Sequence, residues 1–269
     1  MEEERRQRAG ELADQGHPPK LASIRVGDDP STVSYEIGLS KAFTRLGLDY
    51  ECVSYPGDID EDELVEAVAA VGANDEISGI LLLMPWPKHL NEERVIESIP
   101  AIKDVDGVRL DQLGRVLAYN HEGFHNCAIA SVIAFLDFYD IDLTGKRVLL
   151  LGAGRLVNRP LSMLLLERRA TVLLTNSKTV DPAGLAQEAE VIVSSMGNPD
   201  VITEDFLRED HVIIDVGTSF DKGKIEGDFP KDLADKVAAY TPTPGGVSGL
   251  TTTILALHTV EAREKMLQK

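Results

Sequence analysis

Apolar runs and amphipathic stretches alternate along the whole chain. In the first half, the segments 20–26, 50–55 and 78–84 predict strands, and the third of them is apolar almost throughout. Apolar residues recur at helical spacing in the segments between them. The expected helices cover 2–15, 32–46 with Ser31 or Thr32 as its cap, a segment that Asp60 caps, and a short segment from Asn91 to about 99. This order predicts parallel strands joined by helical crossovers.

The second half repeats the same alternation. Strands are expected near 147–151, 170–175, 190–195 and 212–216, with a short one at 238–241 and a closing helix from about 250 to 266. A helix over 128–137 links the two halves, and the glycine-punctuated stretch at 108–124 is expected to be irregular. The chain is therefore predicted to be an α/β protein with two α/β lobes.

The stretch KRVLLLGAGRLVNRP at 146–160 has the layout of a phosphate-binding unit. A buried strand is followed by the turn Gly152-Ala153-Gly154 and then by a helix that begins near Pro160. Such a turn presents backbone N–H groups and a helix N-terminus to an anion. The fingerprint GxGxxG would need glycine where Val157 stands. Taken by itself, the motif is equally compatible with a dinucleotide site and with a structural turn.

Composition excludes several classes of protein. The formal net charge of −18, from 27 basic and 45 acidic residues, argues against a nucleic-acid-binding surface. No apolar run approaches the roughly 18 residues of a membrane span, and the charged N-terminus predicts no secretory signal. Cys52 and Cys127 suggest free thiols in a cytoplasmic protein. His121 and His125 lie four apart around a glycine, so no metal site is expected.

Eight motifs in a fixed order resemble the family of bifunctional methylenetetrahydrofolate dehydrogenase/cyclohydrolases. The resemblance covers nearly the whole chain. It implies two α/β lobes with a cleft between them, a folate domain at 1–124 plus 250–269, and a Rossmann-like NAD(P)-binding domain at 125–249. The motifs are GDDPS at 27–31, GILLLMPWPKH at 79–89, KDVDG at 103–107, GAGRLVNRP at 152–160, TNSKT at 175–179, VIIDVG at 212–217, GD at 227–228 and TPTPGGV at 241–247.

The resemblance implies hydride transfer from 5,10-methylenetetrahydrofolate to a nicotinamide. In bifunctional members the methenyl product is then hydrolysed to 10-formyltetrahydrofolate. Tyr35 matches the family tyrosine that stacks on the pterin, and Asp106 matches the aspartate that accepts hydrogen bonds from its amino edge. These two residues are the expected catalytic and substrate-binding pair. Pro244, Gly245 and Gly246 match a loop that lines the folate pocket.

Two polar residues of the family's catalytic site are replaced by leucine. The catalytic lysine position is Leu39, and the position of its glutamine partner is Leu83. Lys41 lies six residues after Tyr35 and points about 120° away on a helix, so it does not replace the lysine. Losing both partners removes the acid–base groups that activate water, whereas hydride transfer moves no proton. We expect dehydrogenase activity with weak or lost cyclohydrolase activity.

The cofactor positions carried over from the family also depart from its pattern. Gly154 stands in place of serine, and Asn158 in place of glycine, where we expect asparagine to tolerate an unusual backbone conformation. Arg155 and Arg159 either meet the pyrophosphate or lie in solvent. The expected cofactor-binding residues are Gly152, Ala153, Gly154, Arg155, Val157, Asn158, Ser177, Lys178 and Thr218.

The segment TNSKT carries no acidic residue for the ribose hydroxyls, which favours NADP, with NAD as the alternative. Ser177 and Lys178 match the family residues that face the 2′-phosphate. Two other functions stay open at this point. One is a non-catalytic homologue that binds a pterin or nucleotide, and the other is a dehydrogenase for another pterin carrier of one-carbon units. The resemblance also implies a homodimer through the cofactor lobe.

Overall fold

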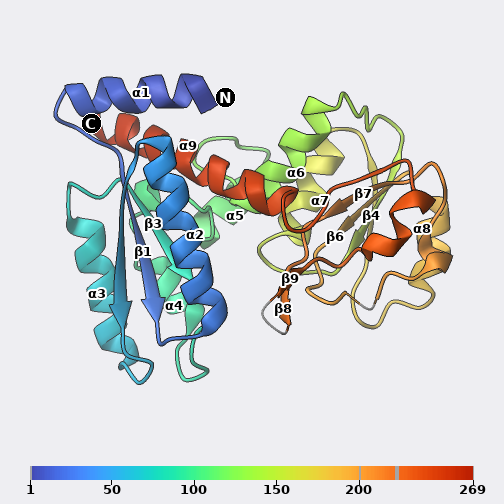
Figure 1. Cartoon of the computed structure of the whole chain (residues 1–269), viewed down its shortest axis with the longest axis horizontal. Helices are drawn as coiled ribbons and strands as arrows, with labels where there is room; N and C mark the ends of the chain where they lie inside the picture. Colours follow the sequence, from blue (N-terminus) through green and yellow to red (C-terminus); the bar gives the residue numbers. More distant parts are fainter. Residues whose placement is uncertain (1, 200, 222–223, 269) are drawn as a thin grey trace. The chain divides into compact units, whose positions relative to one another are not determined.

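The computed structural model describes residues 2–199, 201–221 and 224–268 (Figure 1). The chain divides into two compact units, which are treated separately below. Unit 1 consists of residues 1–114, 121–127 and 252–269. Unit 2 consists of residues 115–120 and 128–251. Each unit is built around its own parallel sheet.

The sheet of unit 1 has the order β2-β1-β3, and both strand pairs are parallel. Leu21 of β1 lies opposite Tyr50 of β2 and Gly79 of β3. This arrangement confirms the expected parallel strands with helical crossovers. The elements that begin in this unit are α1 (Glu2–Asp14), β1 (Lys20–Val26), α2 (Pro30–Leu46), β2 (Asp49–Tyr55), α3 (Glu61–Ala73), β3 (Gly79–Leu83), α4 (Glu92–Glu97), the 3₁₀ turn η1 (Ala101–Lys103) and α5 (Leu110–Leu117).

Helix caps follow the sequence in two cases out of three. Asp60 accepts a hydrogen bond from the N–H of Asp62, and Asn91 caps α4, as predicted. The prediction that Ser31 or Thr32 caps α2 is wrong. Asp29 is the N-cap, and its carboxylate accepts the N–H of Ser31 at 2.9 Å. Pro30 then fills the first helical position, where its missing N–H is not needed.

Helix α5 lies in the stretch predicted to be irregular, so that prediction is wrong. Gly114 lies in the interior of this helix, where a glycine costs about 1 kcal/mol relative to alanine. Packing outweighs this propensity. Gln112 is buried, donates to the carbonyl of Ala101 at 3.1 Å and accepts the N–H of Phe124 at 3.2 Å.

The main sheet of unit 2 has the order β10-β7-β6-β4-β5, with every pair parallel. The chain leaves β4 toward β5 and then returns to β6 on the other side of β4, so the topological switch point lies between β4 and β6. The elements from α6 onward are α6 (Cys127–Phe138), β4 (Arg147–Leu151), α7 (Asn158–Glu167), β5 (Thr171–Leu174), α8 (Pro182–Glu188), β6 (Val191–Ser194), η2 (Glu204–Phe206), β7 (Val212–Asp215), β8 (Ser219–Asp221), β9 (Lys224–Glu226), η3 (Lys231–Lys236), β10 (Ala239–Tyr240) and α9 (Val247–Leu267). Helix α6 begins at the last residue of a unit 1 segment, and α9 begins in unit 2 and continues into unit 1.

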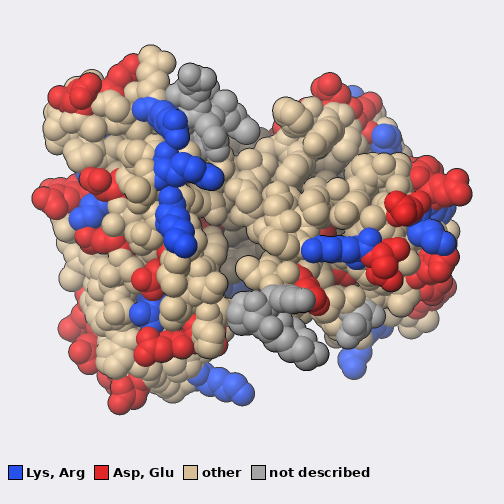
Figure 2. Space-filling model, in the orientation of Figure 1, with Lys and Arg blue, Asp and Glu red and all other residues tan. Residues whose placement is uncertain are grey.

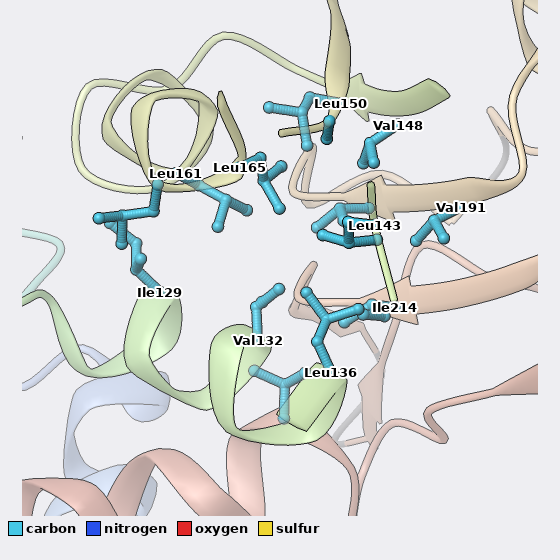
Figure 3. Packing of buried hydrophobic residues seen from close by; sticks show 14 of the residues in the cluster. Ile129, Val132, Leu136, Leu143, Val148, Leu150, Leu161, Leu165, Val191 and Ile214 are labelled. Atoms are coloured by element: carbon cyan, nitrogen blue, oxygen red, sulfur yellow. The ribbon is translucent and has the colours of Figure 1, made fainter. Parts of the chain in front are cut away.

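Successive strand residues face two different cores, because side chains alternate across a sheet. On one face, Val148 and Leu150 of β4 pack in a cluster with Leu161 and Leu165 of α7 and Val132 of α6 (Figure 3). On the other face, Leu149 and Leu151 pack in a second cluster with residues of α8 and η2. Burial on both faces explains why these strands read as continuous apolar runs.

The sequence did not predict the antiparallel pair β8–β9, which is only three residues long in each strand.

The acidic residues lie mainly at the surface. On the face drawn in Figure 2, Asp and Glu side chains are scattered over both units. Among the described residues, no helix combines the length and apolar character that crossing a bilayer requires.

Candidate active site

Tyr35 lies on α2 with its side chain 42% exposed. Burial around the hydroxyl raises the pKa of Tyr35, and the negative charge of Asp106 adds to this effect. A hydrogen bond with Thr252 acts on the pKa in the opposite direction. The ring therefore offers accessible surface for a planar ligand, while its hydroxyl lies in the same polar environment as Asp106.

Asp106 lies in the loop between η1 and α5, where backbone and side-chain groups hold it. Its Oδ1 accepts the N–H of Cys127 at 3.3 Å, and its carbonyl accepts from Asn126 Nδ2 at 3.1 Å. Burial raises the pKa of Asp106 to about 7, and the neighbouring charge of Asp104 adds to the shift. Tyr35 and Asp106 are thus brought together within unit 1, and the carboxyl of Asp106 titrates near neutral pH.

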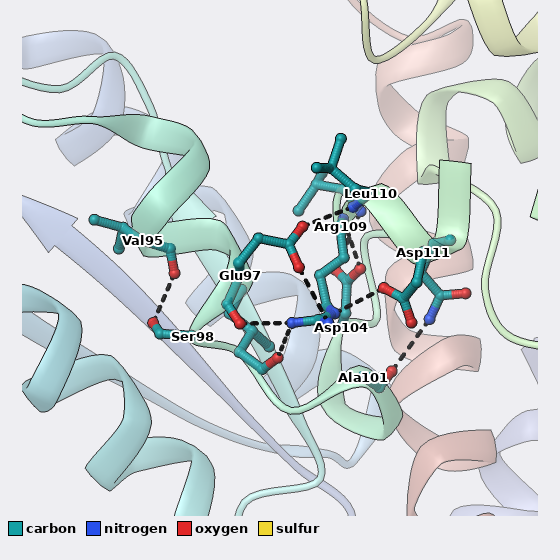
Figure 4. A network of polar contacts seen from close by, with 11 residues as sticks. Val95, Glu97, Ser98, Ala101, Asp104, Arg109, Leu110 and Asp111 are labelled. Atoms are coloured by element: carbon teal, nitrogen blue, oxygen red, sulfur yellow. Dashed lines mark hydrogen bonds and ion pairs between the residues drawn. The ribbon is translucent and has the colours of Figure 1, made fainter. Parts of the chain in front are cut away.

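The loop that carries Asp106 is braced by a polar network (Figure 4). Asp104 is buried and accepts the N–H groups of Val108 at 3.2 Å and Arg109 at 3.0 Å. The Arg109 guanidinium donates to the carbonyls of Glu97 and Ile99 at 2.6 and 2.8 Å. Burial raises the pKa of Asp104 to about 6. The motif KDVDG therefore owes its fixed shape to its first aspartate, whereas the charge of the second acts on Tyr35.

The structure adds two residues that the sequence did not single out. His258 of α9 lies with Nδ1 2.8 Å from the carbonyl oxygen of Val105. The thiol of Cys127 donates to the same carbonyl at 3.5 Å, and burial raises the pKa of this thiol. Both contacts tie distant helices to the residue before Asp106. No pattern in a single sequence marks either residue, because both become neighbours of KDVDG only in the folded chain.

Leu39 and Leu83 are both buried in unit 1, with 1% and 2% of their surface exposed. Lys41 is exposed. Lys103 is buried, but its Nζ donates to the carbonyl of Asn74 at 2.7 Å and serves the loop structure. A lysine at position 39 would have to bury its ammonium group, which is costly without a polar partner.

In unit 2, the turn after β4 needs one of its two glycines. Gly152 has φ of +95°, and a Cβ there would lie 2.9 Å from the carbonyl oxygen of Ser195. It therefore lets the turn after β4 approach the loop after β6 at the switch point. Gly154 is different, because a Cβ there would meet nothing within 4 Å. The open space beside Gly154 is room that a ligand can occupy.

Asn158 is not in the left-handed region, so our reason for asparagine at this position is wrong. It is the first residue of α7 and is fully buried. Its Nδ2 donates to the carbonyls of Leu151 and Gly152, both at 2.8 Å. The amide therefore fastens the start of α7 to the end of β4, and it preserves the turn through its side chain.

Arg155 and Arg159 differ in their surroundings. Arg159 is exposed, whereas Arg155 is partly buried. Within the described residues, the Nη1 atom of Arg155 is buried and has no hydrogen-bond partner. A buried guanidinium nitrogen without an acceptor is costly, and an anionic ligand would satisfy it. Arg155 lies in the turn before α7, where the helix dipole also favours an anion.

The other expected cofactor residues follow the carboxyl ends of β5 and β7. Ser177 and Lys178 are exposed in a tight turn, in which Asn176 Oδ1 accepts the N–H of Lys178 at 2.9 Å. Thr218 is exposed just after β7. The described carboxyl ends of β4, β5 and β7 thus carry all of these positions, including Ala153 and Val157 in the first turn.

Pro244, Gly245 and Gly246 also belong to unit 2, in the loop before α9. Gly246 donates its N–H to the carbonyl of Pro242 at 2.6 Å. A Cβ at Gly246 would lie 2.6 Å from that same oxygen, so only glycine fits there. Gly245 has φ of +110° and open space around its α-carbon. The loop is compact, and its glycines are required by its geometry.

A parallel sheet with a glycine turn and an unsatisfied guanidinium at its switch point defines unit 2 as a dinucleotide-binding domain. Comparison with known proteins assigns both parts of the chain to one family. The family model "Tetrahydrofolate dehydrogenase/cyclohydrolase, catalytic domain" matches residues 1–106, and "Tetrahydrofolate dehydrogenase/cyclohydrolase, NAD(P)-binding domain" matches residues 126–267. The chain belongs to the tetrahydrofolate dehydrogenase/cyclohydrolase family. This confirms the predicted family and the Rossmann-like NAD(P)-binding domain.

Individual relatives agree with this assignment. The bifunctional protein FolD of Carboxydothermus hydrogenoformans is 38% identical over 268 residues, covering 98% of this chain and 93% of the relative. The structure of the bifunctional FolD enzyme of Campylobacter jejuni has a TM-score of 0.93 at 31% identity and covers 98% of this chain and 95% of its own. The NADP-bound FolD of Trypanosoma brucei has the same fold, with a TM-score of 0.93 at 24% identity over 100% of this chain and 95% of its own.

Proposed function

We propose that the chain oxidises 5,10-methylenetetrahydrofolate to 5,10-methenyltetrahydrofolate with NADP, and that it hydrolyses the methenyl product weakly or not at all. The observation that carries the proposal is the contrast within unit 1. Tyr35 and Asp106 are present and share one environment, whereas Leu39 and Leu83 bury apolar side chains at the positions of the family's polar pair. We assign residues 1–124 plus 250–269 to folate binding and 125–249 to the cofactor.

In this assignment the residues of unit 1 bind and orient the pterin. Tyr35 provides the stacking surface, and ionised Asp106 accepts hydrogen bonds from the amino edge of the ring. Asp104 and Arg109 hold the loop of Asp106 in place before substrate arrives. Such preorganisation accelerates the reaction, because hydride transfer depends mainly on holding the carbon that gives the hydride against the nicotinamide carbon that accepts it. Pro244, Gly245 and Gly246 are assigned to the folate pocket.

The cofactor residues of unit 2 fit a dinucleotide. Gly152 permits the tight turn, Gly154 leaves open space, and Arg155 has a buried nitrogen in need of an anion. Lys178 and Ser177 are exposed where a 2′-phosphate would need a cation and a donor, which favours NADP over NAD. The bound cofactor supplies the nicotinamide that accepts the hydride.

The absence of an amine and an amide at positions 39 and 83 is the basis for weak cyclohydrolase activity. Water attack on the methenyl carbon needs a group that takes a proton, and general acid–base catalysis typically contributes about 10²–10⁴-fold. Of the described residues assigned to the pterin in unit 1, Tyr35 has a pKa raised by burial, and Asp106 is committed to the pterin. Hydride transfer needs no such group, so one activity is retained without the other.

A paired assay tests the proposal. One trace follows reduction of NADP, and of NAD separately, with 5,10-methylenetetrahydrofolate, and the other follows decay of added methenyltetrahydrofolate above the buffer rate. We expect reduction of NADP without faster decay. No reduction with either nucleotide would refute the dehydrogenase, and decay far above the buffer rate would refute the weak cyclohydrolase.

The two arginines of the turn offer a matched test of the cofactor site. Arg155→Ala is expected to raise the KM for NADP at least about tenfold, because it removes a charge-assisted hydrogen bond to the cofactor. Arg159→Ala, at an exposed position, is the control and is expected to change this KM less than about twofold. Steady-state kinetics at constant salt measure both. Equal effects of the two substitutions would contradict the assignment.

We also propose that the chain forms a homodimer through unit 2. Phe138, the last residue of α6, and Tyr139, which follows it, are 78% and 65% exposed. Tyr139 lines an apolar groove of about 530 Å³ together with Phe135 and Tyr240. Exposed apolar patches of this kind mark association surfaces. Light scattering is expected to give twice the monomer mass for the natural chain and the monomer mass for Phe138→Ser with Tyr139→Ser. A monomeric natural chain would contradict the proposal.

A further inference from the structure

Two buried carboxylates lie together at the carboxyl edge of the sheet in unit 2, outside the residues assigned to the cofactor. Asp215 ends β7 and is 1% exposed, and Asp228 follows β9 and is fully buried. In the described part of the chain, neither carboxylate forms an ion pair with lysine or arginine. Both are instead satisfied by hydrogen-bond donors, most of them backbone N–H groups. We call these two residues the carboxylate clamp.

Asp228 holds the loop that follows β6. Its Oδ2 accepts the hydroxyl of Ser194 at 2.6 Å and the N–H of Met196 at 2.7 Å. Its Oδ1 accepts the N–H of Asn198 at 2.8 Å. Because the two oxygens of one carboxylate bind donors at both ends of residues 194–198, they fix the path of this short loop.

Asp215 holds the turn that follows β7 and joins it to Asp228. Its Oδ1 accepts the N–H of Gly217 at 3.0 Å and that of Asp228 at 3.1 Å, and its Oδ2 accepts the N–H of Phe229 at 3.1 Å. Burial raises the pKa of Asp215 to about 6, so the carboxylate is held at an energetic cost.

Two glycines make room for the clamp. A Cβ at Gly217 would overlap the carboxylate of Asp228, and a Cβ at Gly227 would overlap Oδ2 of Asp215. The motifs VIIDVG and GD are therefore complementary, since each supplies one aspartate and the glycine that accommodates the other.

The loops that the clamp holds border the switch point. The carbonyl of Ser195, in the loop after β6, is the atom that a Cβ at Gly152 would approach to 2.9 Å. Thr218 follows Gly217 directly and is one of the assigned cofactor residues. The clamp thus ties together one neighbour of the glycine turn and the turn that presents Thr218.

We infer that Asp215 and Asp228 are positioning residues for hydride transfer, which fix residues 195–198 and 217–218 as a wall beside the glycine turn against which the cofactor is held. This inference rests on the proposed function. The clamp does not touch the reacting atoms. It acts by holding backbone groups, and a displacement of about 1 Å in such a wall can cost about 100-fold in rate.

The test compares variants that disturb the clamp in different ways. Asp228→Asn replaces one acceptor oxygen by a donor, and Gly217→Ala pushes a methyl group against the intact carboxylate. We expect both to lower kcat and raise the KM for NADP by about tenfold or more, with the KM for the folate substrate unchanged. Leu136→Ala, which opens a cavity in the core of unit 2, is the control for lost stability.

The inference holds if the clamp variants lose activity in this pattern while Leu136→Ala, at a similar drop in melting temperature, keeps natural kcat and KM values at 25 °C. Natural kinetics in the clamp variants, or the same loss in Leu136→Ala, would overturn it. If both clamp variants fail to fold, Ser194→Ala decides, because it removes one donor and leaves both carboxylates. We expect a rise of about twofold or more in its KM for NADP, and no rise would overturn the inference.

Failure of the proposed function would look different. In that case the natural chain itself would show no reduction of NADP. Titration calorimetry with NADP alone then tests the clamp, since the wall is expected to contribute to binding without chemistry. Binding about tenfold weaker in Asp228→Asn than in the natural chain would support the inference. Equal binding, or none in the natural chain, would overturn it.

Discussion

Replacing Leu39 by lysine and Leu83 by glutamine together is expected to raise the hydrolysis of methenyltetrahydrofolate by about 100-fold or more. The double substitution restores an amine and a polar partner at two buried positions of unit 1. An amine held there can take the proton from the attacking water, and this is the step for which we propose that the natural chain lacks a group. Dehydrogenase activity is expected to persist, because Tyr35 and Asp106 are unchanged.

The single substitutions are expected to fail for a physical reason. Leu39→Lys alone places an ammonium group at a position with 1% exposure and no partner, which typically costs about 3–5 kcal/mol. Leu83→Gln alone buries an unsatisfied amide, at a cost of about 1–3 kcal/mol. The double variant should be more stable than the sum of the two losses predicts, since each group satisfies the other.

Two measurements and a control variant complete this test. Chemical unfolding of the four chains gives the coupling free energy between positions 39 and 83, and decay of methenyltetrahydrofolate gives the hydrolysis rate. Leu39→Met is the control for side-chain shape, because it adds no charge and is expected to leave both activities unchanged. A folded double variant that reduces NADP but hydrolyses no faster than the natural chain would show that the missing pair is not the reason for weak hydrolysis.

Local patterns predicted most of the fold because they reflect strong physical constraints. The run at 147–151 reads as a strand because alternate residues are buried in two separate clusters. Asp60 and Asn91 were identified as caps because a short polar side chain before an apolar stretch satisfies free N–H groups. Helix α5 was missed because its stability comes from tertiary contacts of Gln112 rather than from helix propensity.

The candidate site was predictable only where a motif lies in one segment. The contact of His258 with Val105 joins residues 153 positions apart, and no local pattern marks it. The clamp shows the same limit, since Asp215 and Asp228 appear in separate motifs whose complementary shapes emerge only in space. Asn158 was expected to preserve the turn through an unusual backbone conformation, whereas in the structure its side-chain amide joins the start of α7 to the end of β4.

The protonation of Asp106 is expected to control the pH dependence of the dehydrogenase. Only the ionised carboxyl accepts hydrogen bonds at both oxygens from the amino edge of a pterin. Because burial raises the pKa of Asp106 to about 7, kcat/KM for the folate substrate should rise with pH up to about 7 and then level off. Asp106→Asn should lower kcat/KM by about 100-fold and abolish this rise.

The unfolding free energy of the natural chain is expected to fall as pH rises, whereas kcat/KM rises. A carboxyl with a raised pKa binds its proton more tightly in the folded state, so protonation stabilises the fold at low pH. This contribution is lost as pH rises from about 4, the ordinary value, to about 7. Relative to the natural chain, Asp106→Asn should therefore gain unfolding free energy across this range, by at most about 4 kcal/mol.

Both effects are measured on the same proteins, by kinetics between about pH 5.5 and 8.5 and by urea unfolding between about pH 4 and 8.5. Asp142→Asn is the matched control, because Asp142 is exposed and its pKa is lowered by its hydrogen bonds with Thr144. It should leave the kinetic profile unchanged. If kcat/KM of the natural chain is flat through pH 7, or if kcat/KM of Asp106→Asn still rises, then ionisation of Asp106 does not cause the pH dependence of the reaction. The pterin contact would then have to be made by another group of unit 1.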